Sequence, residues 1–296
     1  MSCLVCQSDA RVLRHSMNDR TQLFQCLHCG LVVRDPILSR EERARRYDSA
    51  AYFTKVSTPD HGLYGYTNYV RDRYLFMWLF AERMDEIEEL QPRGRLLDVG
   101  CAMGVLLDVA RLRGWEVQGV DVSGFAAKIA QDFYNLDVFR GELREARLPA
   151  ESFDVVTMDD VIEHVEDPRG ELEEAARVLR PGGLLALSTP NAGSLVARAM
   201  GRHWFHFKQE EHFYFFTPRS MRTLLEDLGF EVLSVRRAPR TVDLKYLFER
   251  LGYYQARASR VLLRLSRPFL TTRIGFFIYT GEMRIYARKL AAAGGN

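Results

Sequence analysis

The feature that most constrains the fold of this chain is a glycine-rich turn between two short apolar segments. The first segment enters the turn as Leu96-Leu97-Asp98-Val99-Gly100-Cys101-Ala102-Met103-Gly104, and the second ends at Asp121. A strand, a glycine turn, a helix and a second strand that ends in an acid form a nucleotide-binding βαβ unit. The glycines let the backbone approach a ligand, and free N–H groups at the helix start point toward it. The spacing predicts that Asp121 binds the hydroxyls of a ribose.

Asp98 distinguishes this turn from one that binds a dinucleotide. A carboxylate two residues before the first glycine repels a pyrophosphate but attracts a ligand that carries positive charge. S-adenosylmethionine (SAM) has an ammonium and a sulfonium group and no phosphate. The turn therefore favours SAM as the ligand.

The same stretch resembles the first motif of the class I SAM-dependent methyltransferases, with Ala102 in the middle position of their usual glycine triplet. The resemblance covers roughly residues 95 to 235, because it continues through residues 153–165, 179–183 and 211–217. It implies an α/β fold with a Rossmann-like, doubly wound sheet of seven mostly parallel strands. The last strand would be antiparallel and inserted next to the fifth.

The resemblance also implies which residues hold the cofactor. Asp98 and Gly100 would bind the methionine part, Asp121 the ribose, and the segment 141–143 the adenine. The expected contacts are Asp98, Gly100, Cys101, Ala102, Gly104, Asp121, Val122, Ser123, Glu142, Leu143, Met158 and Asp159.

Methyl transfer to an oxygen or carbon atom requires removal of a proton, which calls for a base tuned near neutral pH. His212, with Glu211 beside it, follows the predicted fifth strand in a loop of the kind that covers an acceptor pocket. His164 follows the predicted fourth strand. These three residues are the catalytic candidates, and a positioning or structural role for both histidines is the alternative.

Four cysteines near the N-terminus form two Cys-x-x-Cys pairs, Cys3 with Cys6 and Cys26 with Cys29. This spacing lets all four thiolates face one tetrahedral ion, so it predicts a zinc site. The alternative is four unligated thiols. Because the protein fills every ligand position, the zinc would be structural.

The distribution of strand, helix and turn residues predicts six segments. They are a zinc ribbon (1–38), a helical cap or linker (39–94), the SAM-binding core (95–237), a basic helical insertion (238–279), the last strand of the core (280–290) and a tail (291–296). The expected core strands lie at 95–99, 115–121, 138–139, 154–158, 184–188, 230–236 and 283–287. Strands that alternate with helices predict a parallel sheet. Predicted helix starts are marked by Ser39, Ser123, Asp167 and Thr217, and Pro181-Gly182-Gly183 marks the end of the helix that Asp167 begins.

Charge constrains the partners and the location. A net charge of +2 gives no general case for nucleic-acid binding. Residues 236–274, however, contain ten Lys or Arg and two Asp or Glu. This basic segment is either a solvated helical face or a surface for an anionic membrane or a phosphorylated acceptor. The chain has no apolar run long enough to span a bilayer and no secretion signal at its start, so we expect a cytoplasmic protein, with peripheral membrane contact as the alternative.

The predicted activity is methyl transfer from SAM to an O or C atom of a small-molecule, sugar or lipid-linked acceptor. The ribbon, cap and Glu-His loop resemble the branch that includes sugar C-methyltransferases, and quinone O-methyltransferases are further relatives. Two alternatives are an RNA methyltransferase that grips RNA with its ribbon and a non-catalytic SAM-binding or assembly module. The oligomeric state is left open.

Overall fold

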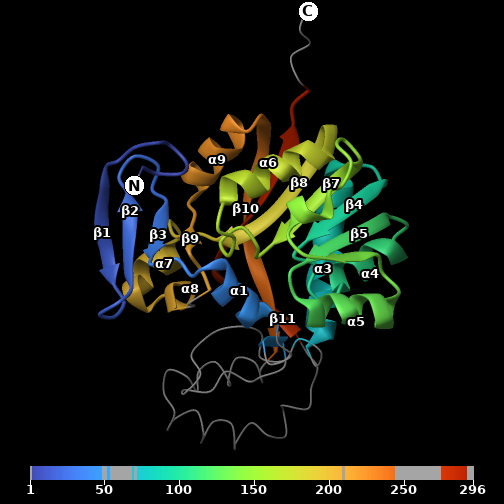
Figure 1. Cartoon of the computed structure of the whole chain (residues 1–296), viewed down its shortest axis with the longest axis horizontal. Coiled ribbons are helices and arrows are strands. Elements are labelled where there is room, and N and C mark those ends of the chain that lie inside the picture. The colour runs from blue at the N-terminus through green and yellow to red at the C-terminus, as the bar shows by residue number, and fades with distance from the viewer. Residues whose placement is uncertain are drawn as a thin grey trace, which may run out of the picture.

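A seven-stranded sheet forms the centre of the molecule (Figure 1). The computed structural model describes residues 2–48, 52–53, 69, 72–208, 211–243 and 275–291. The strand order is β10-β11-β8-β7-β4-β5-β6, in which β11 pairs antiparallel with β10 and β8 and the remaining pairs are parallel. The predicted doubly wound sheet, with its last strand antiparallel and next to the fifth, is confirmed.

Strands and helices alternate along this core. The strands are β4 (Arg95–Val99), β5 (Glu116–Asp121), β6 (Val138–Arg140), β7 (Phe153–Asp159), β8 (Leu179–Pro190), β10 (Phe230–Asp243) and β11 (Gly275–Lys289). The helices are α3 (Arg73–Leu90), α4 (Val105–Leu112), α5 (Gly124–Tyr134), the short 3-10 helix η1 (Leu143–Ala146), α6 (Pro168–Val178) and α9 (Pro218–Asp227). The expected N-caps of α5, α6 and α9 are present, because the side chains of Ser123, Asp167 and Thr217 each accept a hydrogen bond from a backbone N–H of the first turn.

Two apolar layers cover the two faces of the sheet. Consecutive strand residues point to opposite faces, so Leu96 packs with residues of α3, α4 and α5, whereas Leu97 packs with residues of α6 and α9. Both leucines are fully buried. Because both layers are apolar, the central strands are buried on both sides, as a doubly wound parallel sheet requires.

Three strands are longer than the sequence predicts. β8 begins at Leu179, so the Pro181-Gly182-Gly183 segment, expected to end the preceding helix, lies inside the strand. The strand accommodates this segment because its pairing with β7 shifts register beyond Phe153. β10 and β11 pair with each other as far as Asp243 and Gly275. Both ends of the 238–279 segment are therefore strand rather than helix, and residues 244–274 lie outside the described residues.

The N-terminal ribbon shares a second sheet with the core. β1 (Arg11–Ser16), β2 (Gln22–Cys26) and β3 (Val32–Asp35) are joined by β9 (Tyr214–Phe215), which pairs antiparallel with β3. Figure 1 shows these strands beside α7 (Leu195–Met200) and α8 (Phe205–Lys208). Leu23 and Val32 of the ribbon pack with Trp204, Phe207 and Phe215. The ribbon is thus anchored to the core by backbone pairing and an apolar contact.

Helix α1 (Arg40–Tyr47) follows the ribbon and lies near the carboxyl ends of the core strands (Figure 1). As expected, Ser39 caps it: Glu42 N–H donates to Ser39 Oγ at 3.3 Å and Ser39 N–H donates to Glu42 Oε2 at 2.9 Å. In the part of the chain that the structure describes, no helix combines the length and apolarity needed to cross a membrane.

Candidate cofactor and active site

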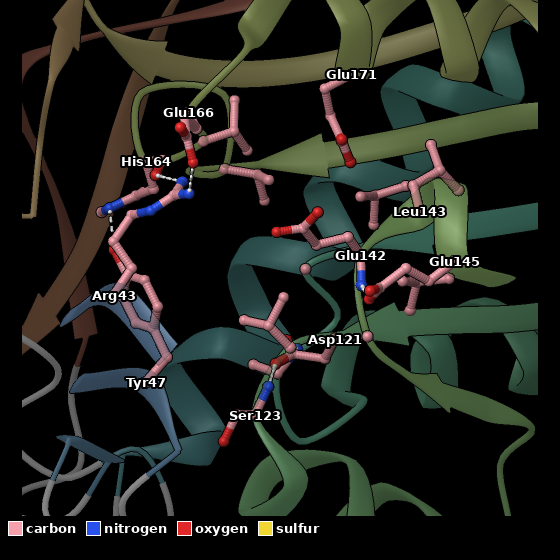
Figure 2. Close-up of a pocket in the computed structure, with 18 of the residues that line it drawn as sticks. Arg43, Tyr47, Asp121, Ser123, Glu142, Leu143, Glu145, His164, Glu166 and Glu171 are labelled. Atoms are coloured by element: carbon pink, nitrogen blue, oxygen red, sulfur yellow. Dashed lines mark hydrogen bonds and ion pairs between the residues drawn. The ribbon is translucent and has the colours of Figure 1, made fainter. Parts of the chain in front are cut away.

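A cavity of about 510 Å³ lies beyond the carboxyl ends of β4, β5 and β7, under α1 (Figure 2). Open α/β sheets collect their ligands at this edge, and the volume is typical of a cofactor pocket. Most of the residues expected to contact SAM line it: Gly100, Ala102, Asp121, Val122, Ser123, Glu142, Leu143 and Asp159. In Figure 2, Asp121 and Ser123 face His164, Arg43 and Tyr47 across the cavity.

The two glycines of the turn have different tasks. Gly100 has a φ of +71°, and a Cβ there would lie 2.4 Å from Val161 Cγ2, so a side chain is excluded at the cavity wall. Gly104 has a φ of +78° and does not line the cavity. A Cβ at Gly104 would lie 2.5 Å from Leu136, so this glycine serves the close packing of the α4 start rather than cofactor contact.

Two backbone N–H groups hold the Asp121 carboxylate in place. Its Oδ2 accepts from Ala102 N–H at 2.7 Å and its Oδ1 accepts from Ser123 N–H at 2.8 Å. Each carboxylate oxygen keeps a further acceptor site, which suits the two hydroxyls of a ribose. The side chain is largely buried, and burial raises the pKa of Asp121 to about 6.

Asp98, Cys101 and Met158 lie away from the main cavity. Asp98 and Cys101 line an adjoining cavity of about 70 Å³, which shares Gly100, Ala102 and Asp159 with the larger one. Asp98 is buried, its Oδ1 accepts from Thr157 Oγ1 at 2.7 Å, and burial raises its pKa well above the usual range. A cationic ligand nearby would favour its charged form. Met158 is fully buried in the core and lines neither cavity, so we remove it from the expected contacts.

The affinity for SAM should depend on pH through Asp121. With a pKa raised to about 6, this carboxyl loses its charge as the pH falls below 6, and a neutral acid is a weaker acceptor for ribose hydroxyls. We expect a dissociation constant that is nearly constant above pH 7 and rises about fivefold between pH 6 and pH 5. Calorimetric titration measures this, with Asp121→Asn as the control. The same pH dependence in Asp121→Asn would contradict the assignment.

His164 lines the cavity, and its neighbours determine which ring nitrogen carries the proton. Its Nδ1 lies 2.9 Å from the carbonyl oxygen of Glu211 and 3.0 Å from Tyr47 Oη. Because a carbonyl oxygen only accepts, Nδ1 carries the proton, and Nε2, which lies 3.9 Å from Oε1 of buried Glu163, keeps its lone pair. Burial lowers the pKa of His164 to about 4, so the imidazole is neutral at pH 7. A neutral imidazole with a free Nε2 can accept a proton, but its pKa of about 4 lies below the near-neutral value that we expect of the base from the sequence.

His212 and Glu211 do not line the cavity, and both are buried behind it. The His212 ring meets the His164 ring edge-on, with centroids 4.6 Å apart. Burial, with further contributions from neighbouring cations, lowers the pKa of His212 well below its usual range. Glu211 contributes its backbone carbonyl to His164. The structure therefore places one of the three catalytic candidates at the cavity and two in supporting positions.

Sequence reasoning missed the part of α1 that closes the cavity. Arg43 donates to the His164 carbonyl at 3.3 Å and to Glu166 Oε2 at 2.6 Å. At the other side of the cavity, Asp48 Oδ1 accepts from Gly124 N–H at 2.8 Å. Arg43 and Tyr47 are four residues apart and so share one face of the helix. That spacing is a signal in the sequence, but it does not reveal what the face covers.

The acids at the end of β7 are also paired in ways that the sequence does not show. Asp159 Oδ1 accepts from Arg83 at 3.0 Å, and Asp160 Oδ2 accepts from Arg240 at 2.7 Å. Arg240 also donates to Glu282 at 2.5 Å. Each arginine is on a segment far from β7 in sequence, so these pairs become visible only when the fold is known. They offset negative charge beside the cavity.

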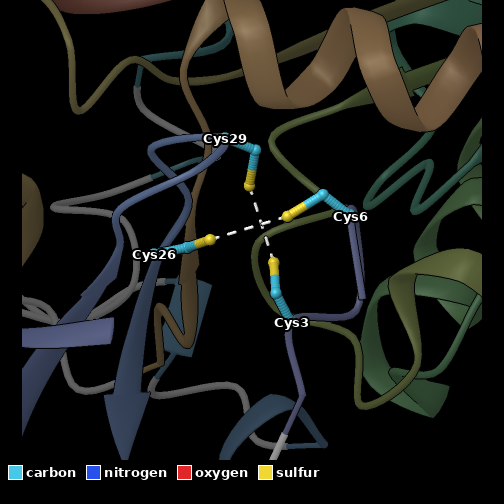
Figure 3. Close-up of side chains that lie close together, drawn as sticks. All are labelled: Cys3, Cys6, Cys26 and Cys29. Carbon is cyan, nitrogen blue, oxygen red and sulfur yellow. Dashed lines mark hydrogen bonds between the residues drawn. The ribbon is translucent and has the colours of Figure 1, made fainter. Parts of the chain in front are cut away.

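The four N-terminal cysteines converge on one point (Figure 3). Cys3 Sγ lies 3.5 Å from Cys29 Sγ, Cys6 Sγ lies 3.6 Å from Cys26 Sγ, and all four sulfurs lie within 4.8 Å of one another. Thiolates around a tetrahedral zinc at 2.3 Å would be about 3.8 Å apart. The contact between the Cys3 and Cys29 sulfurs lowers the pKa of Cys3 and raises the pKa of Cys29, because the thiol of one donates to the thiolate of the other.

The strand order, the glycine turn and the buried acid at the end of β5 define the class I SAM-dependent methyltransferases. A protein family described as a methyltransferase domain matches residues 69–235, which is more than half of the chain. The chain belongs to this methyltransferase family.

Curated proteins that are similar to part of this chain are named as methyltransferases. The chain is 38% identical over 117 residues to a ubiquinone biosynthesis O-methyltransferase from Hahella chejuensis, a match that covers 37% of this chain and 49% of the relative. A second relative of that name, from Psychrobacter arcticus, is 28% identical over 177 residues, which covers 55% of this chain and 69% of the relative. The chain spans about half the length of the first curated relatives that it matches.

Solved structures share the fold. A SAM-dependent methyltransferase from Archaeoglobus fulgidus has a TM-score of 0.52 at 18% identity, covering 75% of this chain and 99% of that one. The [4+2]-cyclase SpnF has a TM-score of 0.51 at 21% identity, covering 72% of this chain and 82% of that one. At such identities the likeness concerns the fold alone, and the cyclase shows that this fold also carries a different reaction.

Proposed function

We propose that the chain transfers a methyl group from SAM to an oxygen atom of a small-molecule acceptor, with His164 as the base. The observation that carries this proposal is one cavity in which Asp121, placed for a ribose, and His164, a neutral imidazole, line opposite walls. When bound, SAM supplies an electrophilic methyl group on a sulfonium. The chain's own residues then orient two substrates, exclude water and remove one proton.

The proton transfer is the step that needs a protein group. As the O–CH3 bond forms and the S–CH3 bond breaks, the acceptor hydroxyl loses its proton, and His164 Nε2 accepts it. The Glu211 carbonyl holds Nδ1–H and thereby keeps Nε2 as the free nitrogen. Tyr47 and Arg43 of α1 contact the ring and the backbone of the same histidine. We therefore assign them, with His212, to its orientation.

Oxygen is favoured over carbon as the methylated atom because the first curated relatives are named O-methyltransferases. A quinone-like, sugar or lipid-linked acceptor stays a prediction. So do the RNA methyltransferase and the non-catalytic module, which no observation on the described residues favours.

A labelling experiment tests the proposed function. Purified full-length protein is incubated with a small-molecule extract and SAM that carries a deuterated methyl group, and products are followed by mass spectrometry. We expect a metabolite that gains one labelled methyl group with the wild-type protein and not with His164→Ala. If wild-type protein that binds SAM labels nothing across extracts from several growth conditions, the catalytic proposal fails.

We further propose that Cys3, Cys6, Cys26 and Cys29 hold one structural zinc ion. The proposal rests on the near-tetrahedral spacing of their sulfur atoms and on their place between the ribbon strands and the core. A closed shell of four cysteine ligands leaves no position open for a substrate, so zinc would stabilise the ribbon rather than take part in methyl transfer.

Loss of one cysteine ligand should remove the zinc. We expect one zinc per chain in the wild-type protein by elemental analysis, and less than a tenth of that in Cys26→Ser. Because metal binding contributes to folding, the melting temperature should fall by about 10 °C or more. Cys101→Ser is the control, since Cys101 lies outside the cluster and should leave zinc content unchanged. Full zinc occupancy in Cys26→Ser would overturn the ligand assignment.

A further inference from the structure

A second hollow, a surface groove of about 980 Å³, runs between the ribbon and the segment of η2 (Gly201–His203) and α8. Its lining contains three arginines and one histidine, and Asp19 is the one acid among the described lining residues. The lining residues are Met17, Asn18, Asp19, Arg20, Thr21, Arg34, Pro36, Leu38, Arg202, His203 and Phe207. We call this hollow the ribbon groove.

Two cations of the ribbon groove lack the carboxylate partners that several arginines elsewhere in this protein have. Arg83, Arg113 and Arg240 are each paired with carboxylates at 3.0 Å or less. By contrast, Arg20 and Arg202 have no carboxylate partner within the described ranges. Like charges without such partners attract an anion to a groove, because its low-dielectric walls focus the field of the charges.

The floor of the ribbon groove contains the ring of Phe207, which is packed against basic and aromatic side chains. Phe207 is fully buried, the Arg14 guanidinium lies 5.3 Å above its ring, and the His15 ring meets it edge-on with centroids 5.6 Å apart. Arg14 also donates to the carbonyl of Ala192. Burial lowers the pKa of His15, and the charges of Arg14 and Arg202 lower it further, which is the effect of crowded cations.

The ribbon groove adjoins the active site. Buried Arg34 lines the groove and donates to the His212 carbonyl at 2.8 Å, and the His212 ring contacts His164 at the cofactor cavity. Leu38, at the edge of the groove, lies two residues before α1, which closes that cavity. Arg34 and His212 therefore connect the groove to the His164 side of the cofactor cavity.

We propose that the ribbon groove binds a phosphate or pyrophosphate group of a soluble acceptor whose methylated end lies at His164. The role of the groove in acceptor binding rests on the proposed function. A single carboxylate is satisfied by one guanidinium fork, whereas a phosphate ester offers several charged oxygens and suits several arginines that approach from different sides. The ribbon would then bind part of the substrate in addition to stabilising the fold.

Binding of inorganic pyrophosphate to the full chain tests this proposal without any need for turnover. We expect saturable binding by calorimetry in the wild-type protein, at least tenfold weaker binding in the double variant Arg20→Glu with Arg202→Glu, and unchanged binding in Arg219→Glu with Arg222→Glu. The control pair lies on α9, is exposed, and changes the net charge by the same amount. Loss of binding in both double variants, or no binding to the wild type, would overturn the proposal.

Two further measurements separate the groove proposal from the cofactor assignment and from binding to a membrane surface. SAM binding should be equal in the wild type and both double variants. If pyrophosphate does not bind, the SAM measurement still tests the cofactor assignment. If SAM does not bind, the pyrophosphate measurement still tests the groove. In the second measurement, the proteins are mixed with phosphatidylcholine vesicles that contain phosphatidic acid. Vesicle binding that requires Arg20 and Arg202, without binding of pyrophosphate, would assign the groove to a membrane surface and refute the soluble acceptor.

Discussion

Asp121→Ala is expected to weaken SAM binding by at least about 100-fold while the protein stays folded. The substitution removes the acceptor for two ribose hydroxyls, and hydrogen bonds to a charged group contribute about 1.5 to 3 kcal/mol each. It also frees Ala102 N–H and Ser123 N–H, which the carboxylate holds at 2.7 and 2.8 Å. The glycine turn then loses part of its organisation. Isothermal titration calorimetry measures the affinity, and thermal denaturation reports the fold.

The control for this variant is a second aspartate nearby. Asp132→Ala changes an exposed residue of α5 that pairs with Lys128 on the helix surface, and it should bind SAM like the wild type. Asp121→Asn preserves the shape of the side chain and removes its charge, so it should lie between Asp121→Ala and wild type. Wild-type affinity in Asp121→Ala would show that the ligand of this cavity is not held through its ribose.

His164→Ala is expected to lower kcat by about 100- to 10,000-fold with little change in SAM affinity. This is the usual contribution of a positioned general base, and the assigned Nε2 is the only ring nitrogen free to accept the proton. Because burial lowers the pKa of His164 to about 4, it is already deprotonated at pH 6. The kcat of the wild-type enzyme at saturating SAM should therefore stay constant between pH 6 and pH 8. With an unperturbed histidine as the base, kcat would rise near pH 6.5.

His212→Ala distinguishes a base from a supporting residue. The His212 ring is buried against His164 and absent from the cavity wall, so its loss should lower the melting temperature and reduce kcat less than His164→Ala does. If His212→Ala abolishes turnover with SAM binding intact while His164→Ala retains it, His212 is the base, and our assignment of His164 is wrong.

Local sequence patterns were sufficient to predict most of the core. The apolar segments, the glycine turn and the helix caps at Ser123, Asp167 and Thr217 all act within a few residues of where they occur, and the structure has them as expected. The cysteine spacing is informative for the same reason. A single metal ion restricts the ligand positions so strongly that two Cys-x-x-Cys pairs can meet in few ways.

Contacts between distant segments could not be predicted. β9 has two residues and becomes a strand only because β3 lies beside it. The sequence does not choose between His212 and His164 as the base, because the choice depends on which imidazole the fold buries behind the other. Arg43 and Arg240 lie far from the glycine turn in sequence, and their roles follow from helix packing and from the extended β10. The extension of β10 and β11 into the basic segment reflects their pairing with each other, which a pattern of apolar spacing does not reveal.

The account depends most directly on what occupies the cavity beneath α1. A crystal structure of the full chain grown with S-adenosylhomocysteine, the demethylated cofactor, gives the clearest result. We predict this ligand in the cavity of about 510 Å³, with both ribose hydroxyls on Asp121 and the thioether sulfur on the side of His164. A cavity that stays empty at saturating ligand, or one that accepts a dinucleotide in its place, would contradict the account.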